Sequence, residues 1–303
     1  MATQYITRIL CPTDFSDASA QAFEHAAFVA RWYHARLTAM HALMPLVTPV
    51  AVLAGPADSI VAEVERARQQ IGLDSAAAAR LGIDVDVVVE TGEPTRCILN
   101  LAAALPADLI VMGTHGAGGF QHLILGSVTE KVLRQASCPV LTVPPRARTT
   151  ANLPYQRLLC PVDFSDSSLA ALGHARRFAD ESNAELTVLH VLEWPWNEPP
   201  APRLDELPHR EASSLAEFRR YEEAEARGRL DSLVCSMDAR RPTKIEIRHG
   251  KAYRELLRLA EERQTDLIVM GVHGHNAVDL ALFGSTTNQV VRQATCPVLT
   301  IRR

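Results

Sequence analysis

The chain repeats most of its sequence once, and this internal repeat constrains its fold more than any other feature. Four segments of the first half return nearly unchanged in the second half: 8–19 at 157–168, 37–42 at 186–191, 107–113 at 265–271 and 132–143 at 290–301. A repeat of this length indicates two homologous domains. Among the 303 residues we therefore expect a first domain at 1–147, a linker at 148–156 and a second domain at 157–303.

Within each half, short apolar runs alternate with segments of helical periodicity. In the first half the expected strands are 8–12, 37–43, 84–90, 108–113 and 139–143, and the expected helices are 18–33, 57–81, 94–105 and one that begins near 127. Strands that are joined through helices form right-handed crossovers and a parallel sheet covered on both faces. The sequence therefore predicts an α/β fold of two tandem, open, doubly wound, Rossmann-like domains, each a five-stranded parallel sheet with helices on both faces.

The last strands of the two halves, 139–143 and 297–301, are expected at sheet edges. An edge strand presents unpaired N–H and C=O groups, so these two strands are able to pair with each other. Such pairing makes an intrachain pseudo-dimer of the two domains, and a homodimer of whole chains is a further assembly to consider.

Two proline-rich segments, 43–57 and 193–210, interrupt the scheme after the second strand of each half. They differ strongly between the halves, which is typical of surface excursions. Either they are lids, with Trp194 and Trp196 covering a site or an interface, or they are hydrophobic plugs on long loops.

Composition and charge exclude several classes of protein. The chain is 47% hydrophobic and 22% charged, as globular proteins are, and its net charge of −4 argues against a non-specific nucleic-acid binder. No apolar run approaches the roughly 18 residues of a membrane helix, and the first residues lack the features of a signal peptide. We therefore expect a cytoplasmic protein with neither nucleic acid nor membrane as a partner. The six cysteines include no C-x-x-C and are expected to be free structural thiols.

A glycine frame, Gly-x-x-Gly followed by nine residues and Gly-Ser, occurs in each half between the fourth strand and the next helix. Its members are Gly113, Gly116, Gly126 and Ser127 in the first half and Gly271, Gly274, Gly284 and Ser285 in the second. The first glycines allow close approach of a ligand or a positive φ. The Gly-Ser pairs begin helices whose free N–H groups favour an anion. Nearby hydroxyls add donors for phosphate, namely those of Ser127, Thr129, Ser285, Thr286 and Thr287.

Two common phosphate-binding fingerprints do not fit this frame. A Walker loop requires a lysine after the glycines, and none follows them here. The dinucleotide fingerprint requires glycines in the first strand-to-helix turn, which reads CPTDFS or CPVDFS. A bound phosphate would then be neutralised by backbone N–H groups, hydroxyls and a cation such as Mg²⁺, to which Asp14 or Asp163 offers a carboxylate. The other interpretation of each aspartate is a charge or cap at a helix N-terminus.

These motifs together resemble a known family. With PTDFS or PVDFS after the first strand, His-Ala or His-Val at the second and the glycine frame after the fourth, the chain resembles a tandem member of the universal stress protein A family, in its ATP-binding branch. The resemblance spans nearly the whole chain except the excursions and the linker. It implies that each half binds ATP, or AMP or ADP, with Mg²⁺ near Asp14 or Asp163.

The resemblance also implies which residues form each nucleotide site. Ala42 and Val191 are implied to contact the adenine. The full implied set is Pro12, Thr13, Asp14, Ala42, Met112, Gly113, His115, Gly116, Gly126, Ser127, Val128 and Thr129 in the first half, and Pro161, Val162, Asp163, Val191, Met270, Gly271, His273, Gly274, Gly284, Ser285, Thr286 and Thr287 in the second. Thr286 replaces Val128, and His275 and Asn276 are bulkier than their counterparts, which puts equal affinity of the two sites in doubt.

Three hypotheses about function remain open. The first is an ATP-binding stress-response regulator with slow or no hydrolysis, because efficient phosphoryl transfer usually requires a cationic group that the frame lacks; His115 and His273 either assist slow hydrolysis or only shape the loop. The second is a metal-linked protein, in which His273, His275 and Asp279 bind zinc. The third is a protein-interaction module with vestigial nucleotide sites.

Overall fold

The computed structural model describes residues 6–44, 56–80, 82–114, 125–145, 147, 155–193, 209–237, 242–272 and 284–302. The elements of the first half are β1 (Arg8–Pro12), α1 (Asp17–Tyr33), β2 (Arg36–Leu43), α2 (Pro56–Arg80), β3 (Val85–Thr91), α3 (Pro94–Ala104), β4 (Leu109–Gly113), α4 (Ser127–Gln135) and β5 (Val140–Val143). Those of the second half are β6 (Arg157–Pro161), α5 (Asp166–Ser182), β7 (Glu185–Leu192), α6 (His209–Cys235), β8 (Lys244–His249), α7 (Ala252–Glu262), β9 (Leu267–Gly271), α8 (Ser285–Gln293) and β10 (Val298–Ile301). The predicted alternation of strands and helices is confirmed in both halves.

The strands form one continuous sheet of ten, in the order β3-β2-β1-β4-β5-β10-β9-β6-β7-β8. Within each half all neighbouring strands are parallel, as predicted. The two halves are joined where β5 and β10 pair antiparallel, with Leu141 opposite Leu299. The pairing of the two terminal strands that the sequence suggested is therefore present, and the two five-stranded sheets merge into one.

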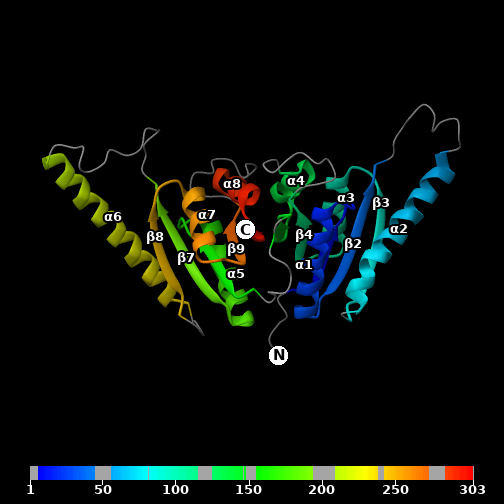
Figure 1. The fold of residues 1–303 in the computed structure, drawn as a ribbon, viewed down its shortest axis with the longest axis horizontal. Helices are drawn as coiled ribbons and strands as arrows, with labels where there is room; N and C mark the ends of the chain where they lie inside the picture. The colour runs from blue at the N-terminus through cyan, green and yellow to red at the C-terminus, as the bar shows by residue number, and fades with distance from the viewer. Residues whose placement is uncertain are drawn as a thin grey trace.

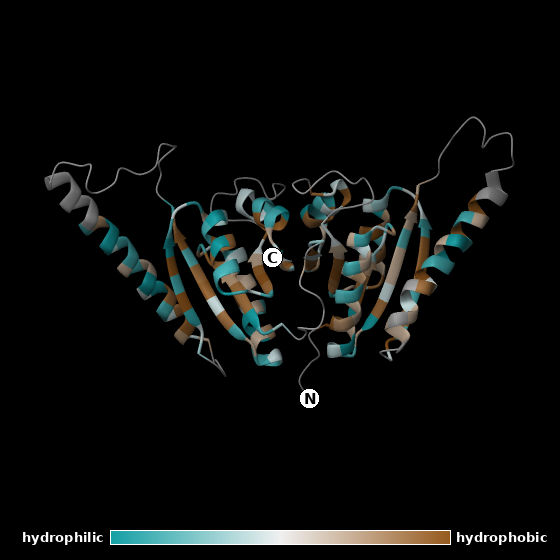
Figure 2. Ribbon diagram, in the orientation of Figure 1, coloured by the Kyte–Doolittle hydropathy of each residue, from teal (hydrophilic) through white to brown (hydrophobic). Residues whose placement is uncertain are grey.

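Helices cover both faces of this sheet. One buried core includes residues of α1, α2, α5 and α6, and a second core includes residues of α3, α4, α7 and α8. Figure 1 shows α2 and α6 at the two outer ends of the molecule, beside β3 and β8. Hydrophobic residues concentrate on the strands, while the helices contain many hydrophilic residues (Figure 2). This is the doubly wound arrangement that the sequence predicts.

The strand order fixes where a ligand site is expected. β1 and β4 are neighbours, but the chain leaves β1 towards β2 through α1 on one face and leaves β4 towards β5 through α4 on the other face. The same reversal occurs between β6 and β9 in the second half. Ligands of open α/β sheets bind at such a switch point, beyond the carboxyl ends of the strands.

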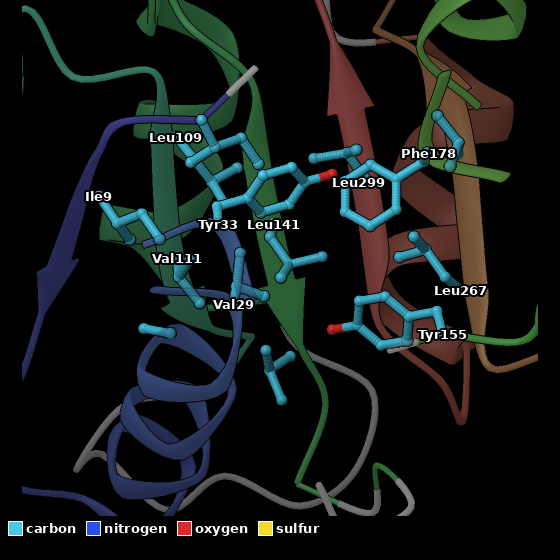
Figure 3. Close-up of a cluster of buried hydrophobic side chains, with 14 of the residues drawn as sticks. Ile9, Val29, Tyr33, Leu109, Val111, Leu141, Tyr155, Phe178, Leu267 and Leu299 are labelled. Carbon is cyan, nitrogen blue, oxygen red and sulfur yellow. The ribbon is translucent and has the colours of Figure 1, made fainter. Parts of the chain in front are cut away.

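An aromatic cluster packs the two halves together on the α1 and α5 face of the β5–β10 junction (Figure 3). The centre of the Phe178 ring lies 5.3 Å from the ring centre of Trp32, 5.8 Å from that of Tyr33 and 6.2 Å from that of Tyr155. The Tyr33 hydroxyl donates to the Glu181 carboxylate at 2.6 Å. The junction is thus held by side chains as well as by the strand ladder.

All six cysteines are free thiols, as predicted, and burial raises the pKa of Cys11 to about 12. Among the described helices, none is long and apolar enough to cross a membrane. The predicted excursions fall largely on residues 45–55 and 194–208, which lie outside the described residues together with Trp194 and Trp196.

Stability should depend on pH through His25, which shares a hydrogen bond with the Tyr155 hydroxyl at 3.1 Å across the junction. Burial lowers the pKa of His25 from 6.5 to about 4, so the unfolded chain binds this proton more readily than the folded chain. The contribution of neutral His25 to the free energy of unfolding is therefore complete above pH 6.5 and is lost as the pH falls towards 4. We expect the free energy of unfolding to fall by about 2 kcal/mol between pH 7.5 and pH 5 through this group.

Denaturant unfolding at the two pH values checks this expectation. His25→Gln keeps a hydrogen-bonding side chain and does not titrate, so the pH dependence of the wild type should exceed that of the variant. Equal pH dependence in the two proteins would contradict the assignment to His25.

Candidate nucleotide site

The structure brings most of the predicted site residues to the two switch points. The turns after β1 and β6 meet the ends of β4 and β9 and the starts of α4 and α8. Residues 115–124 and 273–283 lie outside the described residues, and they include His115, Gly116, His273, Gly274, His275, Asn276 and Asp279. The described part of each site therefore consists of the two ends of the glycine frame and the aspartate turn beside them.

In the aspartate turn of the first half, the Asp14 carboxylate accepts hydrogen bonds from the backbone N–H of Ser16 at 3.1 Å and from its hydroxyl at 2.6 Å. The Ser16 oxygen in turn accepts from the N–H of Ser19 and is the N-cap of α1. The helix is therefore capped by the serine, so the interpretation of Asp14 as a helix cap is wrong. The aspartate instead supports the capping residue.

The second half repeats this network. The Asp163 carboxylate accepts from the Ser165 N–H at 3.0 Å and from its hydroxyl at 2.5 Å, and Ser165 caps α5. The same chemistry in both halves shows that PTDFS and PVDFS encode one turn. Asp14 is exposed and Asp163 is partly exposed, so solvent reaches both residues.

Each aspartate turn contains a phenylalanine in the left-handed region. Phe15 has a φ of 64° and Phe164 a φ of 63°. A bulky residue rarely adopts this conformation, and it costs on the order of 1–2 kcal/mol. Such strain persists only where surrounding contacts impose it, and it is often found at functional sites.

Gly113 and Gly271, the first glycines of the two frames, were expected to allow close approach of a ligand or a positive φ. Neither has a positive φ, so that alternative is wrong. A Cβ at Gly113 would lie 2.9 Å from the backbone carbonyl carbon and oxygen of Ala18, and a Cβ at Gly271 would lie 2.8 Å from the carbonyl carbon of Ser167. The glycines therefore let the first turn of α1 or α5 pack directly on the end of β4 or β9.

Thr129 and Thr287 were expected to donate to phosphate, and the structure corrects this expectation. Each hydroxyl donates to the carbonyl of the first frame glycine at 2.9 Å, Thr129 to Gly113 and Thr287 to Gly271. Both side chains are buried, 5% and 3% exposed. Their hydroxyl protons are committed to fixing the helix start against the strand end.

The starts of α4 and α8 have the form that the frame predicts. Gly126 and Gly284 are the N-caps of these helices, and a glycine has no side chain with which to cap the first N–H groups. The Gly126 N–H donates to the Thr114 carbonyl at 2.9 Å, and the Gly284 N–H donates to the Val272 carbonyl at 3.0 Å, so the two ends of each frame are tied together. Ser127 and Ser285, the next residues, are exposed. The first N–H groups and the helix dipole thus favour an anion at this place.

The remaining predicted residues form the walls around these groups. Pro12 and Pro161 end β1 and β6, and Thr13 and Val162 follow them. Met112 and Met270 are buried in the core on the α3 and α7 face, and Ala42 and Val191 pack against that same core. Val128 and Thr286 are partly exposed beside the helix starts. The implied adenine contacts therefore lie at the ends of β2 and β7, on the side of the sheet that faces α3 and α7.

The two halves differ in charge near the site. In the first half Lys131 of α4 pairs with Glu93 at 3.6 Å. The equivalent positions of the second half hold Gln289 and Lys251. In addition, the Arg229 guanidinium of α6 lies 3.8 Å from the ring centre of Phe164. The surroundings of the two sites are thus unequal even though their backbone frames match.

Sequence reasoning assigned no role to His41 and His190, although both halves place a histidine at the end of the second strand. The His41 Nδ1 lies 2.8 Å from the Thr13 carbonyl oxygen, and the His190 Nδ1 lies 2.6 Å from that of Val162. Repetition of the histidine at one position of the repeat was the available signal.

Mg²⁺ fits this donor set only together with a ligand. Among the described residues, no three His, Cys, Asp or Glu side chains gather as a metal site. Within the described residues, the aspartate turn of each switch point offers one carboxylate, that of Asp14 or of Asp163. Mg²⁺ is commonly held in this way, by one or two carboxylates together with phosphate oxygens and water.

Comparison with known proteins agrees with the fold. A model of the universal stress protein family matches residues 6–144 and 154–302. A universal stress protein of Mycolicibacterium smegmatis is 29% identical over 313 residues, which cover 99% of this chain and 98% of the relative. Another, from Methanocaldococcus jannaschii, is 35% identical over 141 residues, which cover 45% of this chain and 81% of the relative.

One solved structure matches the fold of the whole chain. The crystal structure of a universal stress protein from Archaeoglobus fulgidus covers 98% of both chains with a TM-score of 0.69 and 23% identity, which is a match of fold. A universal stress protein crystallised in complex with cAMP is 26% identical, with 46% of this chain and 98% of that chain covered and a TM-score of 0.35. Because the family model matches both halves, this chain belongs to the universal stress protein family, as a tandem protein with two such domains.

Proposed function

We propose that this protein is an ATP-binding regulator of the stress response, with one nucleotide site in each half and slow or no hydrolysis. The domains are 1–147 and 157–303, joined by the linker 148–156, and they act as a pseudo-dimer within one chain in the cytoplasm. ADP and AMP are alternative ligands of the same sites. The observation that carries the proposal is that α4 and α8 both begin with a glycine N-cap at a switch point beside an aspartate turn.

The chemistry of these groups suits a nucleotide phosphate. The free N–H groups at the start of α4, together with the Ser127 hydroxyl, donate to phosphate oxygens, and the α8 start with Ser285 and Thr286 does the same. The Asp14 and Asp163 carboxylates would hold Mg²⁺, which would neutralise part of the phosphate charge. His115, Gly116, His273 and Gly274 are proposed to flank the phosphates.

Slow or absent hydrolysis follows from the charges near the site. Phosphoryl transfer is normally accelerated by a cation on the γ-phosphate and by an oriented nucleophile. Lys131, the first cation of α4, is paired with Glu93. The site therefore favours retention of ATP over its turnover.

Calorimetric titration with ATP, ADP, AMP and cAMP, with and without Mg²⁺, tests the proposal. We expect the wild type to bind two equivalents of ATP and to turn it over more slowly than about once per second, the lower end of typical enzyme rates. Failure to bind any of these nucleotides would overturn the proposal and favour an interaction module. Turnover at several per second would overturn its regulatory part.

A matched pair of variants locates the phosphate. Gly126→Asp places a good N-cap and a negative charge at the start of α4, while Gly126→Asn places an equally good cap without the charge. We expect the aspartate variant to weaken ATP binding in the first half at least about tenfold more than the asparagine variant, because it repels the phosphate as well as capping the helix. Equal affinities in the two variants would contradict a phosphate at this helix start.

A further inference from the structure

We propose that His41 and His190 are positioning residues of the two nucleotide sites, which hold each aspartate turn in the conformation that presents its carboxylate to the ligand. This inference rests on the proposed nucleotide-binding function. It concerns residues that lie outside the implied nucleotide contacts, and it gives each histidine a role through the backbone of the turn.

The hydrogen bond shows that Nδ1 of each ring carries a hydrogen. A carbonyl oxygen only accepts, so the Nδ1 that lies 2.8 Å from the Thr13 oxygen carries a hydrogen and donates it. The same reasoning applies to His190 and the Val162 oxygen at 2.6 Å. Both histidines are thus held with a proton on Nδ1.

The second strand of each half forms hydrogen bonds with both the backbone N–H and the backbone carbonyl of the residue before each aspartate. The Thr13 N–H donates to the Met40 carbonyl at 2.8 Å, while the Thr13 carbonyl accepts from His41. In the second half, Val162 makes the same two bonds, with the Leu189 carbonyl at 2.8 Å and with His190. Because the bonds use the backbone, they are kept although threonine is replaced by valine.

The residue after each aspartate is supported by the same histidine. The ring centres of Phe15 and His41 lie 4.5 Å apart, and those of Phe164 and His190 lie 4.9 Å apart. These phenylalanines are the left-handed residues of the turn, so the ring contact helps to keep them in a conformation that is otherwise unfavourable. Each aspartate is therefore fixed on both sides by one histidine.

The histidines are placed to act on the turn and not on the adenine. Side chains alternate between the two faces of a strand. Ala39 belongs to the core on the α1 face and Met40 to the core on the α3 face, so His41 faces α1 while Ala42 faces α3. A direct contact of His41 with an adenine held at Ala42 is not needed to explain its bonds.

The test measures ATP binding to the first site, in protein whose second site is blocked by Gly284→Asp. His41→Leu removes the donor, whereas His41→Asn keeps an N–H group near the position of Nδ1. We expect His41→Leu to weaken binding of ATP with Mg²⁺ about tenfold, and His41→Asn to keep it within about threefold of the unmodified histidine. In an Asp14→Ala background, His41→Leu should cause no further loss, because the histidine acts through the aspartate turn.

A second measurement requires no nucleotide. Long-range proton–nitrogen NMR spectra of the nucleotide-free protein should show a hydrogen on Nδ1 of His41 and of His190. Nδ1 without a hydrogen in both residues would overturn the inference, as would equal ATP affinity of the wild type and His41→Leu. If the wild type binds no nucleotide at all, the proposed function fails first and the positioning role fails with it.

Discussion

Gly113→Ala is expected to lower the free energy of unfolding by about 3 kcal/mol and to disturb the first nucleotide site at the same time. The new Cβ would lie 2.9 Å from the backbone carbonyl carbon and oxygen of Ala18, and real Cβ atoms do not approach backbone that closely. Backbone in the first turn of α1 cannot move aside as a flexible side chain does. The helix must shift away from β4, and the aspartate turn that precedes it must shift too.

The chain offers a matched control for this substitution. Gly173 lies within α5, and a Cβ there meets nothing within 4 Å. Gly173→Ala should raise the free energy of unfolding by about 0.5–1 kcal/mol, since alanine is the better helix former. Denaturant unfolding of the two variants measures the difference. Similar stabilities would show that α1 does not pack on β4 as closely as the structure has it.

The repeat was sufficient to predict the architecture of this chain. Strands, helices and the doubly wound class followed from periodicity, because parallel strands buried on both faces leave continuous apolar runs such as LIVMG at 109–113 and 267–271. The pairing of β5 with β10 was also anticipated from two edge strands of matching sequence. These features depend on patterns that a single sequence displays directly.

The reasons for individual residues at the site were harder to predict. Gly113 follows the expected pattern of a ligand-binding glycine, yet its missing side chain makes room for Ala18, which lies 95 positions earlier in the sequence. The Thr129 hydroxyl is bound to a strand carbonyl, not left open for phosphate. In both cases the partner belongs to another element of the fold. Ala18 lies outside the frame, and although Gly113 lies within it, the spacing of the frame does not show that the Thr129 hydroxyl bonds to the Gly113 carbonyl.

The role of the histidines was equally hard to predict from the sequence. His41 stands 28 positions after Thr13, whose carbonyl it binds, so no local motif connects them. Only the register of β1 with β2, in which Pro12 lies opposite Met40, brings the next residues of the two strands together. A repeat shows that a residue recurs at one position, whereas the reason for the recurrence requires the sheet.

The largest effect on stability is expected from Phe178→Ala, at about 4 kcal/mol of lost free energy of unfolding. Phe178 is 3% exposed, and its ring packs against those of Tyr33 and Tyr155 (Figure 3). It also packs against the ring of Trp32. Trp32 and Tyr33 belong to α1 of the first half, whereas Phe178 belongs to α5 of the second. Removing the ring opens a cavity at the junction of the halves, and the surrounding aromatic side chains lose their packing partner.

Phe218→Ala provides the control, because Phe218 lies on α6 and is 50% exposed, so its loss should change the free energy of unfolding by less than about 1 kcal/mol. A double-mutant cycle between Phe178 and Trp32 separates coupling across the junction from stability of α5 alone, and we expect an interaction energy of about 1 kcal/mol. If denaturant unfolding shows no such coupling, the two halves are held by the β5–β10 ladder and the aromatic cluster stabilises each half separately. Measurable coupling instead means that a change in one domain alters the stability of the other through α1 and α5. These are the two helices whose N-capping serines belong to the aspartate turns of the two sites.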